Sequence, residues 1–138
     1  MLPAEIATHL QSSGLGLTLG TNLFYVPFPD TAPTDQVAVC IVERPGGEGG
    51  RTFGAGAAAL VVEEASFLVM VRGARDGAVA ARSLAEQVRA KLDFGEAVLS
   101  GTRYLSVRPE RPVYGPAYGP LELPVFYVEA LAEKEPSA

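Results

Sequence analysis

Residues 65–94 read ASFLVMVRGARDGAVAARSLAEQVRAKLDF, and this stretch decides the fold of the chain. Residues 67–71 are all apolar, which is typical of a strand covered on both faces in the middle of a sheet. From Asp76 onward, apolar residues recur at helical spacing and predict an amphipathic helix of about four turns. We expect Asp76 to cap the start of this helix and Gly95 to end it.

Shorter patterns predict the remaining elements on either side of this strand and helix. Residues 3–12 have apolar side chains at helical spacing and predict a short helix. Residues 23–26 predict a short strand that lies at an edge or leads into a turn, because the prolines that follow cannot donate ladder hydrogen bonds. Residues 37–42 are apolar on both faces and predict a second central strand. Two later strands are expected at residues 104–108 and 125–131.

Together these elements predict an α+β fold with roughly five strands and two helices in the order α-β-β-β-α-β-β. The simplest architecture is a single mixed or antiparallel β-sheet with two helices on one face. Three of the strands are apolar on both faces, so the second face of the sheet also needs a cover. The cover could come from the Gly-rich and Pro-rich loops of the same chain, folded back over a curled sheet, or from a neighbouring subunit.

Two long segments of unusual composition connect the predicted elements. Residues 46–56 contain six glycines in eleven residues, which is typical of a mobile loop or a long hairpin tip. Residues 109–124 hold five of the eleven prolines and predict an extended loop. The fold therefore carries a long Gly-rich loop and a long Pro-rich loop.

Length, charge and composition restrict the class of protein. A chain of 138 residues with 48% hydrophobic residues fits one domain, expected at residues 1–132, followed by a polar tail at residues 133–138. The net charge of −5 argues against broad binding to nucleic acid phosphates or to an anionic membrane. One cysteine allows no disulfide framework, and no stretch approaches the ~18 apolar residues of a membrane span. We expect a soluble intracellular protein without an export signal.

The residues that could carry chemistry form no catalytic constellation. Residues 54–59 match G-x-G-x-x-A, but they lead toward a strand, whereas a dinucleotide site needs a helix there. His9 is the only histidine and is expected to be a packed or solvated helix residue. Cys40 reads as a small buried hydrophobe, and Glu63 and Glu64 point to opposite faces of a strand. We predict no enzymatic activity, no catalytic residue, no cofactor and no metal.

Charged and aromatic side chains instead predict contacts with protein partners. The planar fork of arginine suits protein interfaces, and tyrosines in a pre-extended loop lose little freedom on binding. The candidate interface residues are Arg72, Arg75, Glu86, Arg89, Arg108, Arg111, Tyr114 and Tyr118. The candidate flexible partner loop comprises Gly46, Gly47, Gly49, Gly50, Gly54 and Gly56. A merely solvated surface is the alternative for the charged and aromatic residues.

The order of these features resembles the tail terminator, or tail completion, proteins of long-tailed bacteriophages, some of which are called minor capsid proteins. The resemblance runs from about Ile6 to Val128 and is one of order and spacing. Its motifs are Asn22-Leu23-Phe24 before Pro27 and Pro29-Asp30, Pro45-Gly46-Gly47, Val69-Met70-Val71-Arg72-Gly73, Lys91-Leu92, Arg108-Pro109-Glu110-Arg111-Pro112 and Gly115. The family's usual Asp-Glu pair with a following Arg is replaced by Leu121-Glu122-Leu123, which leaves the subgroup open.

The resemblance implies a non-enzymatic virion subunit that forms a homohexameric ring on the head-proximal end of a phage tail tube. Such a ring stops polymerisation of the tube protein and joins the tail to the head connector or stopper protein. DNA would pass through it only as cargo, and assembly would take place in the host cytoplasm. The alternatives are another head–tail neck or minor capsid protein, a phage-derived contractile device, or a small-molecule-binding module or unrecognised enzyme.

Overall fold

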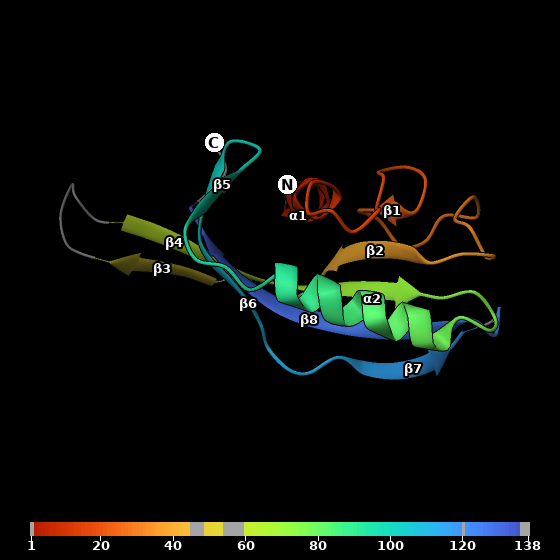
Figure 1. Cartoon of the computed structure of the whole chain (residues 1–138). Coiled ribbons are helices and arrows are strands. Elements are labelled where there is room, and N and C mark those ends of the chain that lie inside the picture. The colour runs from red at the N-terminus through yellow and green to blue at the C-terminus, as the bar shows by residue number, and fades with distance from the viewer. Residues whose placement is uncertain (1, 45–48, 54–59, 120, 136–138) are drawn as a thin grey trace.

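The computed structural model describes residues 2–44, 49–53, 60–119 and 121–135 (Figure 1). The elements are α1 (Leu2–Gln11), β1 (Leu23–Phe24), β2 (Ala38–Glu43), β3 (Gly49–Phe53), β4 (Leu60–Arg72), α2 (Ala78–Lys91), β5 (Ala97–Leu99), β6 (Thr102–Pro109), β7 (Tyr114–Tyr118) and β8 (Pro124–Lys134). In these described residues the fold is α+β, with two helices and one curled sheet of eight strands. The predicted fold class is confirmed.

The two long strands β4 and β8 pair antiparallel and form the centre of the sheet. The other side of β4 is shared by β2, which pairs with residues 67–72, and β3, which pairs with residues 60–64. The other side of β8 is shared in the same way by β6 and β7. β1 pairs parallel with β2, so the sheet is mixed, with β1 at one edge and β5 at the other. The predicted central position of residues 67–71 and the predicted edge strand are both confirmed.

Three short strands add to the five that the sequence predicts. β3 pairs with the start of β4, so residues 49–53 of the glycine-rich segment form a hairpin arm, where the sequence predicted a mobile loop or a long hairpin tip. The other residues of that segment lie outside the described residues. This arm projects away from the helices (Figure 1). β7 lies in the proline-rich segment, where the prediction of a loop was wrong. A proline fits there because β7 pairs on one side only and its register with β8 is irregular between Tyr114 and Ala117.

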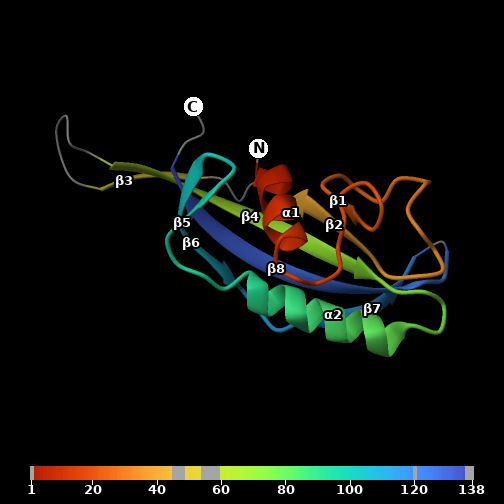
Figure 2. The same cartoon turned by 45° about the horizontal axis from the view of Figure 1, so that its top comes forward.

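Both helices cover the same face of the sheet, as predicted, and Figure 2 shows them in front of it. Alternate residues of the central strands point toward the helices and form one hydrophobic core with them. Its largest fully buried side chains include Ile6, Leu10, Ile41, Phe67, Val69, Leu92 and Tyr104. Truncation of such an aromatic side chain, as in Phe67→Ala, costs about 3–5 kcal/mol of stability.

The predicted caps of the main helix are wrong by a few residues. The N-cap of α2 is Gly77, which follows Asp76, and no side chain caps the helix. The turn is instead closed by the backbone, where the Gly77 N–H donates to the Ala74 carbonyl oxygen at 2.9 Å. The C-cap is Leu92, and Gly95 lies beyond it. This turn also needs a glycine at position 73, because a Cβ there would lie 2.7 Å from the Gly77 carbonyl oxygen.

The second face of the sheet is partly covered by the chain itself. The segment between β1 and β2 folds back so that Phe28 and Ala32 pack on Cys40 and Met70. The cover here comes from the chain itself, but from a different segment than the Gly-rich and Pro-rich loops that were expected to supply it. Toward the other end of β4 and β8 the same face becomes polar, and there it carries the charged cluster described below.

Candidate functional site

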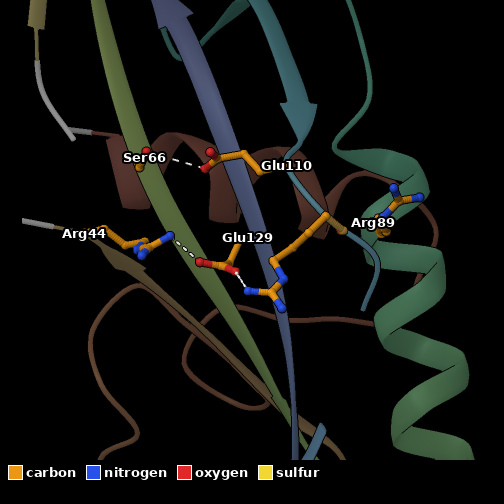
Figure 3. A network of polar contacts seen from close by, with 6 residues as sticks. Arg44, Ser66, Arg89, Glu110 and Glu129 are labelled. Atoms are coloured by element: carbon orange, nitrogen blue, oxygen red, sulfur yellow. Dashed lines mark hydrogen bonds and ion pairs between the residues drawn. The ribbon is translucent and has the colours of Figure 1, made fainter. Parts of the chain in front are cut away.

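Charged side chains on the second face gather around Glu129 of β8 (Figure 3). The Glu129 side chain is 9% exposed, and its two carboxylate oxygens accept hydrogen bonds from the Nη1 atoms of Arg44 and Arg111. The Arg111 contact measures 3.2 Å. Arg44 follows β2 and Arg111 follows β6, so a single carboxylate ties two neighbouring segments to the central strand. Charge-assisted hydrogen bonds of this kind are stronger than neutral ones.

Arg111 also connects the cluster to the proline-rich segment. Its guanidinium carbon lies 4.4 Å from the centroid of the Tyr114 ring, and that ring stacks on Tyr127 with centroids 5.1 Å apart. The Arg89 Nε–H of α2 donates to the Arg111 carbonyl oxygen at 3.1 Å. Burial, and after it the charge of Glu129, raises the pKa of Tyr114. The start of β7 is therefore fixed to both α2 and β8.

Further ion pairs extend the polar surface along β6 and β8. Arg108 pairs with Glu133 at 3.2 Å, and Arg103 contacts both Glu96 at 2.7 Å and Glu135 at 3.0 Å. The arginines of these pairs are more than 40% exposed, so each pair adds little stability. This end of the second face is a charged, solvated surface. β8 also runs two residues into the expected polar tail, as far as the buried Lys134.

The apolar end of the same face contains a cavity of about 240 Å³. Its lining includes Phe28, Met70, Arg72, Tyr118, Leu123 and Tyr127. Arg72, at the end of β4, is only 8% exposed. Its Nη2 donates to the Pro33 carbonyl oxygen at 3.1 Å, and its guanidinium carbon lies 4.3 Å from the centroid of the Phe28 ring. Burial lowers the pKa of this guanidinium.

A buried carboxylate joins α1 to β6 on the helix side of the sheet. Glu5 is 6% exposed and accepts a hydrogen bond of 2.7 Å from the hydroxyl of the fully buried Tyr104, while its second oxygen accepts one from the Thr102 hydroxyl. Burial raises the pKa of Tyr104 far above its usual value, and the bond to Glu5 raises it further. The tyrosine therefore stays a neutral donor, which suits a structural link between two elements.

The side chains that were considered as candidates for chemistry, His9 and Cys40, are packed or buried within the fold. The His9 Nε2–H donates to the Lys91 carbonyl oxygen at 3.0 Å, and its ring packs against Phe94 with centroids 4.8 Å apart. Cys40 is buried, and burial raises its pKa to about 12, so the thiol stays protonated at neutral pH. The glycine motif at residues 54–59 lies outside the described residues, between β3 and β4.

The described residues contain neither a metal-binding cluster nor a membrane-spanning helix. In that part of the chain no group of three or more His, Cys, Asp or Glu side chains could hold a metal ion. None of the helices found there is long and apolar enough to cross a membrane.

The predicted interface residues fall into different places. Those joined to the charged cluster are Arg89, Arg111 and Tyr114, and Arg108 forms its own ion pair with Glu133. Those at the cavity are the buried Arg72 and the 61% exposed Tyr118, while Arg75 and Glu86 are exposed in the β4–α2 turn and on α2. Of the predicted partner loop, Gly49 and Gly50 lie in β3, and Gly46, Gly47, Gly54 and Gly56 lie outside the described residues.

Sequence reasoning did not find two acidic residues that organise these sites, Glu5 and Glu129. In the sequence, Glu129 stands between Val128 and Ala130 in the apolar run of a predicted buried strand. An acid at such a position needs a cationic or hydrogen-bonding partner, and this was the signal that could have identified it.

Comparisons with known proteins give one kind of match. No family model matches the chain, and no curated protein matches it. Among solved structures, the chain is similar to a protein chain of the virion of a native gene transfer agent (GTA) particle, with a TM-score of 0.62 and 18% sequence identity. The alignment covers 98% of this chain and 95% of that chain. At this identity the likeness establishes a shared fold, which extends over nearly the whole of both chains.

Proposed function

We propose that the chain is a structural protein of a phage or phage-like virion, and more specifically a ring-forming tail terminator. The observation that carries this proposal is the shared fold with a chain of a gene transfer agent virion, because it spans almost the full length of both proteins. The resemblance of the sequence to tail terminators supports the specific role. In that role the ring caps the tail tube at its head-proximal end, stops its polymerisation and joins it to the head connector.

The two edges of the sheet support a head-to-tail contact between subunits. β1 and β5 end the strand order on opposite sides, and Figures 1 and 2 show them on either side of α1. Each edge carries exposed apolar side chains, with Val26 at 48% next to β1 and Val98 at 67% in β5. A contact between two different surfaces, repeated by rotation, closes into a ring. The hexameric number comes from the family resemblance.

The role is non-enzymatic and needs neither a cofactor nor a metal. The buried thiol, the packed histidine and the hydrogen-bonded Glu5 all support this, because each already has a structural function. The negative net charge of −5 suits a channel that DNA must pass without adhering to its wall.

The first experiment measures the native mass by light scattering on a sizing column across a concentration series, with negative-stain images of the same fractions. We expect rings with the mass of six copies of the 14.5 kDa chain. The same fractions are then mixed with the self-assembling tail tube protein of the source particle. A terminator binds one end of each tube and shortens the tubes. Tubes of unchanged length with free ends would contradict the proposal, and binding only to isolated connectors would favour another neck protein.

A further inference from the structure

The cavity on the second face lies where neither layer of self-cover reaches the central strands. Phe28 borders it on the β2 side, and Tyr118, Leu121 and Leu123 border it on the β8 side. Its floor comes from Met70 and Arg72 of β4 and from Tyr127 of β8. The cavity is therefore built from four separate segments of the chain.

Arg72 gives this cavity its chemical character. A buried guanidinium normally pairs with a carboxylate, because an uncompensated buried charge is costly. In the described part of the chain no carboxylate pairs with Arg72, and its buried Nε has no hydrogen-bond acceptor there. Its guanidinium donates a hydrogen bond to the neutral Pro33 carbonyl and stacks on Phe28. These contacts fix its position without neutralising its charge.

The walls and the rim of the cavity are mostly apolar. Leu123 is buried in the wall, and two large apolar side chains at the rim, Tyr118 and Leu121, are 61% and 56% exposed. Exposed aromatic and aliphatic groups around a desolvated centre are typical of protein contacts. The volume of about 240 Å³ is below the roughly 300–1,000 Å³ of small-molecule sites, so a few side chains fit better than a cofactor.

We propose that this cavity docks a short segment of a partner protein in which a Glu or Asp carboxylate lies between apolar residues. The carboxylate pairs with Arg72, and a neighbouring aliphatic side chain packs between Met70 and Leu123. Charge complementarity supports this ligand. The Arg72 guanidinium is a buried cation without an anionic partner in the described residues, and a carboxylate flanked by apolar residues would supply the missing charge in an apolar setting. The inference concerns a surface other than the sheet edges and holds for a single subunit, whether or not rings form.

The test is an NMR titration of the ¹⁵N-labelled full chain, at a concentration where light scattering shows a monomer. The probe is the capped peptide acetyl-Ala-Leu-Glu-Leu-Ala-amide, and its matched control carries Gln in place of Glu. We expect saturable shifts of the Arg72 Nε–Hε signal and of the Met70 and Tyr127 amides. The Glu peptide should bind at least tenfold more tightly than the Gln peptide, because hydrogen bonds between charged groups are stronger than neutral ones.

Three variants complete the test. Arg72→Gln should abolish the preference for the Glu peptide. Ala117→Phe, at an exposed position in the lining, should block both peptides while Arg72 stays in place, so it tests the site even if the first variant fails to fold. Arg82→Gln, exposed on α2, removes one positive charge elsewhere and should leave binding unchanged. Equal affinity for the two peptides, or chemical shift changes outside the cavity, would overturn the inference. The ring proposal is decided separately, by the native mass and the negative-stain images.

Discussion

Glu129→Gln is the substitution that most directly tests how the second face is held together. It keeps the volume of the side chain and removes the negative charge that two arginines share. Glu129 is 9% exposed, while Arg44 and Arg111 are 46% and 57% exposed. We expect the variant to fold but to be less stable, with Arg111 and the start of β7 less firmly fixed.

The magnitude follows from these exposures. A hydrogen bond to a charged group contributes about 1.5–3 kcal/mol when it is well buried. Both arginines are about half exposed and can bind water instead, which reduces each contact toward the roughly 0.2–1 kcal/mol of exposed ion pairs. The Glu129 carboxylate is buried, which places the pairs near the upper end of that range. We therefore expect a loss of about 1–2 kcal/mol for the two contacts together.

Urea unfolding of the monomer measures this loss. With m of about 2 kcal/mol/M, in the middle of the usual range for urea, the midpoint should fall by roughly 0.5–1 M at unchanged m. The matched control is Arg108→Gln, which breaks a single pair with Glu133 and should cost less than about 0.5 kcal/mol. The reasoning is refuted if Glu129→Gln costs no more than the control, or if it stabilises the protein. In the latter case desolvation of the carboxylate would outweigh both ion pairs.

Four further outcomes are expected. Tyr104→Phe removes a buried donor to a carboxylate and should cost about 1–3 kcal/mol in urea unfolding, and a neutral result would show that water replaces the hydroxyl. The pKa of Cys40 is raised from 9.0 to about 12, so stability is fully present below pH 9 and falls as the pH rises toward 12. This loss of stability is at most about 4 kcal/mol. In Cys40→Ala the free energy of unfolding should differ less between about pH 8 and about pH 11 than it does in the unmodified protein. Gly73→Ala should cost about 1–3 kcal/mol because its Cβ would meet a backbone carbonyl oxygen, whereas Gly95→Ala, with open space around it, should be near neutral by thermal unfolding. Val98→Glu should leave the monomer folded by circular dichroism and prevent rings on the sizing column, and intact rings would exclude the β5 edge from the contact.

The central part of the fold could be predicted because its signals are local. A strand that is apolar at every position, such as residues 67–71, must be covered on both faces, and this alone places it in the middle of a sheet. The same argument fails for β7, whose prolines argue against a strand. Its formation depends on a free side of β8, which is a contact between distant parts of the chain. The cap of α2 was missed for a related reason, since the backbone turn at Gly77 takes the place of a side-chain cap.

The candidate site was predicted less well than the fold, because burial of a charged residue depends on distant partners. Arg111, Tyr114 and Tyr118 were recognised as candidates from their setting in the proline-rich segment. Glu129, which fixes the first two, depends on Arg44, which lies 85 residues away in the sequence. Arg72 was also a candidate, but its burial follows from the return of Phe28 over the second face, which no local pattern predicts.

The polar half of the second face changes the physical argument for oligomerisation. In the sequence, strands that are apolar on both faces require a cover for the second face, either from loops of the same chain or from a neighbouring subunit. In the structure, Phe28 and Ala32 cover one half of that face, and the other half carries charged groups that water can solvate. Neither half needs a subunit laid across it. If the chain forms a ring, its contacts should therefore use the sheet edges, and the cavity at Arg72 stays available for a different partner.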